Sequence, residues 1–567
     1  MKLQSHVSFL TTCILVLVVL TLGGCSWWDS SQIPGSDLLS KPLGFVETPT
    51  SIDQSATMFV PKDTPIMASL PINPNRLERL VGPKKFNQLK NTVLGNSNID
   101  YQRDIQPWVG DEVTFAVTTP DIDRDSSNGQ QTGLLLAVAT KDAQLSTELL
   151  ELFWQKRAVA GVNLAFDSYQ GVKLIYSQSQ ELTSLATAVV GDGFVLFANH
   201  PKVLRDAINN VQVSGLNINQ NANFQKAFSN SHRDRIGLVF ANLPQIFDST
   251  GIKQPTIPLL EKTTAETPKL NSLEDVAIIF KTTAAEGLVA ETTMLFAEEI
   301  PRTSPTLSQP VAALKLIPSA SSFVAASTDL NNFWQQLSTA ISDNTIVSNL
   351  VNQPLKRMAT SWGIDLPEDI FSWVKGEYAV ALLPNPEKLQ PDLIFVVEKS
   401  SEVTAAIAHL DEIATAQDDS LGAFTLDDQK IYAWTQLTSN FVGKKQKGIN
   451  DTVIKAEVKG VHANLGKYEI FTTSVEAMDE VLKAAERGTF LGREDFQETV
   501  AVLPRSNDGY LYLDLPGLQQ FLEREIPFLR LIELSGKVLL EDLRSLTLTN
   551  IGSEAGVRRA SIFLRFM

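Results

Sequence analysis

Short runs of β-branched and aromatic residues alternate along this chain with longer segments in which apolar residues recur every three or four positions. The short runs predict β-strands, which in the first half we expect at 113–117, 134–138, 173–176, 194–197 and 289–296. The longer segments predict helices with one apolar face. Several strands follow one another through short turns, which favours antiparallel pairing. The pattern predicts an α+β fold with a mainly antiparallel sheet backed by helices on one face.

The helix positions can be placed more closely from their start signals. One helix is expected from Leu145 onward, with Asp142 as its N-cap. Another begins at Pro201, since proline is favoured in the first helical turn. In the second half the corresponding helices are expected after Ser401 and around Met478. Helices of the same kind therefore occur in both halves of the chain.

A duplication organises the sequence. The segment 99–112 returns as 364–377, with Ile, Asp, Asp-Ile, Trp-Val and Glu in the same places. The repeated motif residues are Asp104, Trp108, Glu112, Asp369, Trp373 and Glu377. We interpret the two aspartates as helix N-caps and the two tryptophans as anchors between helix and sheet. A catalytic acid–base pair and a shared binding role are the alternatives for the carboxylates.

Weaker matches follow in the same order, so we expect two tandem homologous domains. The predicted organisation is a signal peptide at 1–24, a flexible tether at 25–53, a first α+β repeat at 54–298, a Pro/Ser/Thr linker at 299–310 and a second repeat at 311–567. The linker contains several proline, serine and threonine residues, which are typical of segments between domains.

The N-terminus carries a targeting signal. A lysine near the start, an apolar run over 9–20 and the sequence Leu22-Gly23-Gly24-Cys25 resemble a bacterial lipoprotein signal. The resemblance implies cleavage after Gly24 and a lipid on Cys25, which would hold the protein outside the cytoplasm, on the periplasmic face of the plasma or outer membrane. An uncleaved transmembrane helix and simple secretion are the alternatives. The apolar run is shorter than the roughly 20 residues that cross a bilayer.

Composition and charge limit the classes of partner. The 567 residues are 43% hydrophobic and 20% charged, which suits a globular protein with substantial cores. The net charge of −16 opposes binding to nucleic acid or to anionic lipid head groups. The basic cluster at 444–447 is interpreted as a solvated loop. Only Cys13 and Cys25 are present, so we expect no disulfide.

Two local patterns resemble ligand sites without completing them. The run Asp121, Asp123, Asp125 resembles the start of a calcium loop, but Ser126 and Thr132 stand where glycine and glutamate are required. We interpret it as a polar hairpin tip. The segment 460–467 resembles a phosphate loop, but it has one residue too many between its glycines and is expected to form strand, turn and strand.

No pattern predicts an active site or a cofactor. The histidines lack the spacing of zinc ligands, and no Gly-x-Ser-x-Gly elbow occurs. We therefore expect no catalytic residues, metal or cofactor. The apolar run over 526–534, around Phe528, is either core or a groove for a lipid or a partner protein.

The repeated Asp-Ile-x-x-Trp-Val-x-x-Glu block, behind the lipoprotein signal, resembles the bacterial domain-of-unknown-function family 3352, which is prominent in cyanobacteria. Val60-Pro61 and the residues after it resemble the start of that family. The resemblance implies no reaction and no ligand. We expect a non-enzymatic, lipid-anchored cell-envelope protein that binds or assembles through its surfaces. The alternatives are a carrier of an apolar ligand or lipid in a cavity between sheet and helices, and a hydrolase without a known motif.

Overall fold

A computed structural model describes much of the chain. The described residues are 55–70, 87, 100–125, 127, 131–178, 185–213, 215–228, 235–250, 273–283, 287–300, 302–331, 369–385, 390–417, 419–441, 452–518 and 543–566. Within these ranges no helix combines the length and the apolar character needed to cross a membrane.

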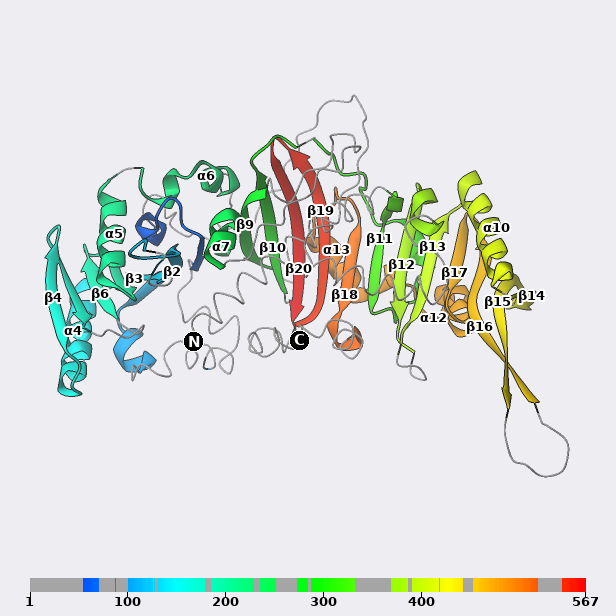
Figure 1. Cartoon of the computed structure of the whole chain (residues 1–567), viewed down its shortest axis with the longest axis horizontal. Helices are drawn as coiled ribbons and strands as arrows, with labels where there is room; N and C mark the ends of the chain where they lie inside the picture. Colours follow the sequence, from blue (N-terminus) through cyan, green and yellow to red (C-terminus); the bar gives the residue numbers. More distant parts are fainter. Residues whose placement is uncertain are drawn as a thin grey trace.

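The described strands form one 20-stranded sheet in which every pairing is antiparallel. From one end to its middle the strands are β4 (Leu164–Tyr169), β5 (Val172–Ser177), β6 (Ala186–Val190), β7 (Phe194–Ala198), β3 (Gly133–Thr140), β2 (Val109–Thr119), β1 (Ile66–Leu70), β8 (Arg235–Asn242), β9 (Leu273–Thr282) and β10 (Gly287–Phe296). From the middle to the other end they are β20 (Val557–Phe566), β19 (Leu543–Glu554), β18 (Tyr510–Asp514), β11 (Phe323–Thr328), β12 (Glu377–Leu383), β13 (Asp392–Glu398), β17 (Tyr468–Thr472), β16 (Thr452–Leu465), β15 (Gln429–Phe441) and β14 (Ser420–Leu426). Figure 1 shows this order along the long axis, with the β15–β16 hairpin projecting from the body.

The two halves of the sheet have the same strand order, read outward from the β10–β20 pair. Strands β9 and β10 begin 270 positions before β19 and β20, at Leu273 against Leu543 and at Gly287 against Val557. By this spacing Glu291 is equivalent to Ser561, and these two residues lie opposite each other in the ladder. Equivalent strands thus pair about an approximate two-fold axis at the centre of the sheet.

Most of the described helices lie at corresponding places in the two halves. The helices are α4 (Ala143–Val159), α5 (Pro201–Gln212), α6 (Ala222–Phe228) and α7 (Leu243–Thr250) in the first half, and α10 (Ser401–Ala416), α11 (Val475–Leu482), α12 (Ala484–Arg487) and α13 (Glu494–Val502) in the second. Short 3₁₀ turns lie at Ala56–Phe59, Ile218–Gln220, Ala312–Lys315, Phe371–Trp373 and Phe490–Gly492, and a π-turn at Tyr101–Ile105.

Local start signals placed the helices well. Asp142 caps α4, with its carboxylate accepting from the Leu145 amide, as the sequence predicts. Pro201 is the first residue of α5, and His200 caps that helix through Nδ1. The cap of α10 is Ser400, one residue earlier than expected, because its Oγ accepts from the amide of Val403.

The α+β class and the antiparallel sheet are confirmed, but the prediction of helices on one face is wrong. Alternate residues of a strand point to opposite faces. On β13, Phe395 and Val397 share a core cluster with α10, whereas Ile394 and Val396 share one with α11. On β3, the alternating residues divide in the same way between α4 and α5. Uninterrupted apolar runs such as 134–138 are typical of strands buried on both faces. Such strands need helices on both faces of the sheet, and this is why the prediction of helices on one face failed.

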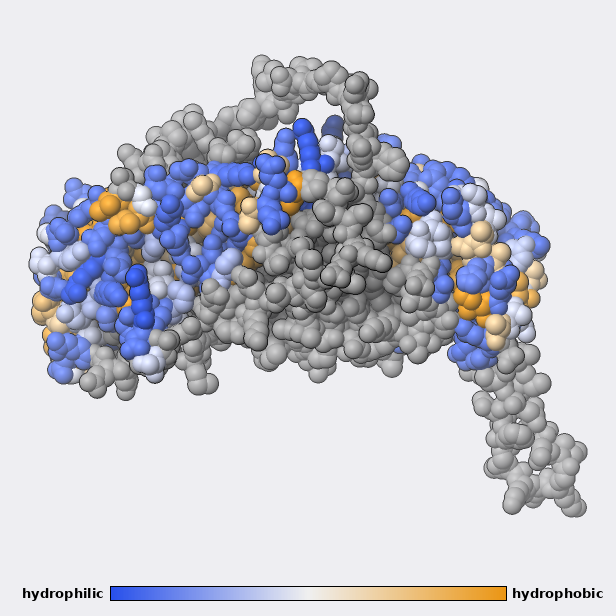
Figure 2. All heavy atoms as spheres, turned by 45° about the horizontal axis from the view of Figure 1, so that its top comes forward, coloured by the Kyte–Doolittle hydropathy of each residue, from blue (hydrophilic) through white to orange (hydrophobic). Residues whose placement is uncertain are grey.

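The segment between the two repeats packs on the second half. Thr303 forms an antiparallel bridge with Ser553, and Leu307 forms one with Asn507. The hydroxyl groups of Thr303 and Ser553 also lie 2.9 Å apart. The described part of the expected linker is therefore tied to the body of the protein. Among the residues coloured by hydropathy in Figure 2, hydrophilic ones predominate and hydrophobic patches are small and separate.

Candidate functional site

The repeated block makes the same contact in both halves. Trp108 Nε1 donates to the backbone oxygen of Asp104 at 2.8 Å, and Trp373 Nε1 donates to that of Asp369 at 2.5 Å. Both indoles are nearly buried, at 4% and 8% exposure. Trp108 packs in a cluster that includes α4, and Trp373 in one that includes α10. Each tryptophan holds the turn before a strand against a helix and the sheet.

The aspartate side chains of the block have different partners in the two halves, and the prediction that they are N-caps is wrong. Asp100 caps the first-half turn, since its carboxylate accepts from the amide of Arg103 at 2.9 Å. Asp104 accepts from the Asp100 amide and pairs with Arg103, which lowers its pKa. In the second half the turn has Ile370 at the N-cap position, and Asp369 lies 3.8 Å from His409.

The glutamates of the block also differ in their surroundings. Glu112 accepts from the Ala56 amide at 3.0 Å and from Ser69 Oγ at 3.1 Å. Burial raises its pKa, while these hydrogen bonds, one from Thr114 and the charge of Arg235 act in the opposite direction. Glu112 is therefore a partly buried carboxylate of the first half, held by an amide and hydroxyl groups.

The second half does not reproduce that site. Ser69 pairs with Thr114 in the first half, whereas the same place in the second half is occupied by Ala326 and Ala379. Glu377 instead accepts from the Tyr468 hydroxyl at 2.5 Å and lies 3.6 Å from Lys467 Nζ. The recurring glutamate therefore keeps its position but not its chemistry.

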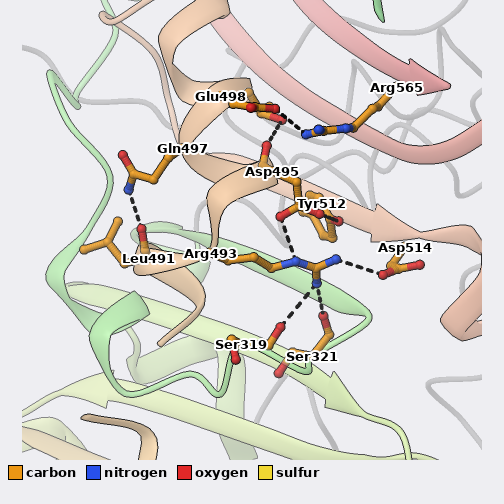
Figure 3. A network of polar contacts seen from close by, with 11 residues as sticks. Ser319, Ser321, Leu491, Arg493, Asp495, Gln497, Glu498, Tyr512, Asp514 and Arg565 are labelled. Atoms are coloured by element: carbon orange, nitrogen blue, oxygen red, sulfur yellow. Dashed lines mark hydrogen bonds and ion pairs between the residues drawn. The ribbon is translucent and has the colours of Figure 1, made fainter. Parts of the chain in front are cut away.

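A second polar site occurs at the same place in each half, where a strand end meets a helix start. In the second half it is centred on Arg493, immediately before α13 (Figure 3). Its Nε lies 2.7 Å from Asp495, and its Nη2 lies 3.0 Å from Asp514 at the end of β18. Its Nη1 donates to the backbone oxygens of Ser319 and Ser321 at 3.3 and 3.1 Å. Arginine therefore ties three separate segments together.

Tyr512 completes this network. The Arg493 guanidinium lies 5.1 Å from the centre of its ring, and its hydroxyl donates to Asp495 at 3.0 Å. Burial acts to lower the pKa of Arg493, but Asp514 and Asp495 outweigh it and the pKa is raised. Burial also raises the pKa of Tyr512. One cation thus lies between two carboxylates, an arrangement of charge-assisted contacts.

The first half carries other residues at these positions. Asn242 of β8 pairs with Asp275 of β9, as Asp514 of β18 pairs with Ser545 of β19. Asn223 and Asn242 donate to the Asp275 carboxylate at 2.6 and 2.9 Å. Burial raises the pKa of Asp275 to about 6. One buried carboxylate between two amides thus replaces an arginine between two carboxylates.

A buried histidine lies on the α10 side of the sheet in the second half. The ring of His462 is stacked 5.0 Å from Tyr432 and 5.2 Å from Trp434. Its Nε2 lies 3.4 Å from the Asp411 carboxylate, to which Trp434 Nε1 donates at 2.8 Å. Burial lowers the pKa of His462, and Asp411 partly offsets this. Sequence spacing could not predict the pair, because its residues lie on a helix and a distant strand.

Comparison with protein families matches residues 11–566 to DUF3352, described as a protein of unknown function. The chain belongs to the DUF3352 family. The family resemblance seen in the sequence is confirmed. No curated protein sequence matches the chain.

Among solved structures, one titled "Structure of crystal form I of TP0453" is similar to this DUF3352 chain at 12% sequence identity. The match covers 43% of this chain and 79% of that one, with a TM-score of 0.24. A likeness at this score carries no argument about fold or function.

The acidic run of the DUF3352 chain uses its carboxylates within its own turn. Asp123 accepts from the Asp125 amide, Asp125 from Ser127, and Asp121 from the Gln131 amide. In the described parts of the chain, no group of three or more His, Cys, Asp or Glu side chains is arranged to hold a metal ion. The segment 460–467 forms the end of β16 and the turn that leads into β17, so the expected order of strand, turn and strand is confirmed.

Several predicted features lie outside the described residues. These are the signal motif and lipid attachment site Leu22, Gly23, Gly24 and Cys25, the basic cluster at 444–447, and the apolar run around Phe528. They stay predictions from the sequence. Sequence reasoning missed the Arg493 network, although the replacement of Asn242 by Asp514 between the repeats was a signal that this position varies in charge.

Proposed function

We propose that this DUF3352 protein is a non-enzymatic, lipid-anchored cell-envelope protein that acts in binding or assembly through its surfaces. One observation carries the proposal: the two halves share their architecture but differ in their buried polar groups. The indole contact recurs at Trp108 and Trp373, whereas the Arg493 network and the Asp275 site occupy one place with different charges. The two repeats therefore share the packing of the tryptophans but not the charges of their polar groups.

The polar groups of the described residues also favour a structural role. Arg493 is held by two carboxylates and two backbone oxygens, and the partly buried Glu112 is held by an amide and hydroxyl groups. A nucleophile and base for hydrolysis would have to converge on one cleft. No described contact favours the hydrolase or the carrier alternative.

The duplication supports a scaffold of two tandem homologous domains. The equal strand order in the two halves, and the pairing of Glu291 with its equivalent Ser561, agree with two copies of one unit. The copies share one hydrogen-bonded sheet, which makes a long platform from β4 to β14 (Figure 1). Such a platform offers a large surface to partner proteins.

Anchoring rests on the signal motif at Leu22, Gly23, Gly24 and Cys25. A lipid on Cys25, followed by the tether at 25–53, would hold the sheet near the membrane outside the cytoplasm, on the periplasmic side. One acyl chain alone gives only marginal binding, so stable retention needs more than one lipid chain on this residue.

The anchor is tested by comparing Cys25→Ser with the matched variant Cys13→Ser, which removes the other cysteine. We expect wild type and Cys13→Ser to incorporate labelled fatty acid and to fractionate with membranes, and Cys25→Ser to carry no label. Intact-protein mass then locates the new N-terminus. A wild-type mass that starts at Met1 with an unmodified thiol at Cys25 would contradict the proposal.

The surface role is tested with a photo-crosslinking amino acid in intact cells. Val159 at the end of α4 is 91% exposed, whereas Leu204 in α5 is fully buried. We expect covalent adducts with envelope proteins from exposed positions such as 159 and none from position 204. An absence of adducts across a panel of exposed positions, with the protein folded and anchored, would count against a binding role.

A further inference from the structure

The sheet ends in two edge strands that are protected differently. In the described structure β4 pairs with β5 and β14 pairs with β15, so each has one edge without a strand partner. An open edge invites pairing with another chain, and proteins counter this with charges, prolines or bulges. On β4, Asp167 forms an ion pair with Arg205 of α5 at 2.5 Å. This charge protects the first edge.

The corresponding position of β14 is a phenylalanine. Two-residue turns close both hairpins, after Tyr169 in β4–β5 and after Leu426 in β14–β15. Two positions before the last residue of each strand, β4 has Asp167 and β14 has Phe424. Phe424 is 40% exposed.

The rest of β14 is equally open. Its sequence, Ser-Leu-Gly-Ala-Phe-Thr-Leu, contains no charged residue and no proline, and its first six residues are exposed. Leu421, on the opposite face from Phe424, is 43% exposed. The strand therefore offers unpaired backbone together with apolar side chains on both faces.

We propose that β14 pairs antiparallel with β14 of a second copy of this chain, which extends the sheet across a two-fold axis. Two observations favour this partner. An uncharged strand places no like charges opposite each other when it pairs with itself. The chain already contains such a junction, because the equivalent strands β10 and β20 pair antiparallel about Glu291 and Ser561.

The net charge of the chain predicts a salt dependence that distinguishes a second copy of the chain from a basic peptide as the partner of β14. Two copies each carrying −16 repel at low ionic strength, so self-association through β14 is expected to strengthen as salt rises. A basic peptide bound to the same edge would bind more weakly at higher salt. The proposal depends on the sheet alone and holds whether or not Cys25 carries lipid.

The test uses the full-length protein in excess detergent, with sedimentation equilibrium over a range of concentrations and salt. Phe424→Asp places on β14 the charge that β4 carries. The matched control is Phe166→Asp, which changes an apolar residue of β4 that is 63% exposed. We expect wild type and the control to dimerise alike, and Phe424→Asp to raise the dissociation constant at least tenfold. Leu421→Asp should act in the same direction, and circular dichroism checks folding.

Three results would overturn the proposal: a wild type that stays monomeric, a Phe424→Asp protein that dimerises as wild type does, or a control that dissociates equally. Single cysteines in a background that carries both Cys13→Ser and Cys25→Ser give a second readout. A cysteine is placed in turn at positions 422, 423 and 424. The one nearest the two-fold axis should form an intermolecular disulfide, which requires Cα atoms closer than about 7 Å. Dimers without a crosslink at any of these positions would be a fourth such result, because they would show association through another surface.

Discussion

Glu291 of β10 lies directly opposite Ser561 of β20, and the two residues are equivalent in the two halves of the chain. Their pairing places an approximate two-fold axis at the centre of the 20-stranded sheet. We call the β10–β20 pair the seam. Because the hydrogen-bonded ladder is continuous across the seam, a change that destabilises one of its strands also affects the other half. The seam is also packed, since Ala290 and Ile562 lie in one buried cluster.

We therefore expect Ile562→Ala to destabilise the protein by about 2–5 kcal/mol, through lost burial and the cavity that remains. Hydrogen exchange should become faster in β10 as well as in β20, because each strand is the partner of the other. Denaturant unfolding and exchange with mass spectrometry measure both effects. Phe166→Ala, at an exposed position of β4, is the control and should change stability by less than about 0.5 kcal/mol. Faster exchange in β20 alone would contradict coupling through the seam.

Trp108→Ala and Trp373→Ala should each cost about 3–5 kcal/mol, because each indole is nearly buried between a helix and the sheet. Trp108→Phe keeps the apolar ring but loses the hydrogen bond to the Asp104 oxygen, and should cost less than the alanine variant. Equilibrium unfolding in urea gives the values. A near-neutral Trp108→Ala variant would mean that this residue does not anchor the fold.

Local features of this fold could be predicted from the sequence, because they depend on neighbouring residues. The cap at Asp142 and the helix start at Pro201 are of this kind. The apolar run 134–138 also indicated that β3 is buried on both faces, a signal that the prediction of helices on one face overlooked. The joining of both halves into one sheet could not be predicted, because a repeat in the sequence does not say which strands meet.

The candidate sites were harder to predict for the same reason. Arg493, Asp514 and the backbone at Ser319 are brought together from three segments of the chain. Neither residue spacing nor residue type marks them before folding. Asp104 was misread because Asp100 lies four positions earlier, and the Asp100 carboxylate is the one that accepts from the Arg103 amide of the turn.

The Arg493 network can be exchanged for the residues of the first half. Arg493→Asn leaves Asp495 and Asp514 without their cation, and we expect a cost of about 3–5 kcal/mol. Adding Asp495→Asn, Asp514→Asn and Ser545→Asp recreates the asparagines and the single carboxylate that surround Asp275, and should restore much of the loss. Unfolding free energies of the single and fourfold variants decide this. If the fourfold variant is less stable than Arg493→Asn, the two sites are not interchangeable.

Asp275 gives the chain a stability that depends on pH. Its pKa is raised from 3.8 to about 6 in the folded protein, because burial disfavours the charged form. Between these values the folded state binds more protons than the unfolded state, so the free energy of unfolding falls as pH rises through this window. By pH 7 the ionisation of Asp275 has lowered the free energy of unfolding by about 3 kcal/mol.

Asp275→Asn removes the titrating group, so its free energy of unfolding should fall less than that of wild type between pH 4 and pH 7. The difference between the two proteins isolates the effect of Asp275 from that of other carboxyls, such as Glu112, whose pKa is also raised. Glu148→Gln, at an exposed position of α4, is the matched control and should follow wild type. Urea unfolding at intervals of half a pH unit measures the curves. Parallel curves for wild type and Asp275→Asn would mean that Asp275 is ionised in the fold without penalty, and that Asn223 and Asn242 compensate its burial in full.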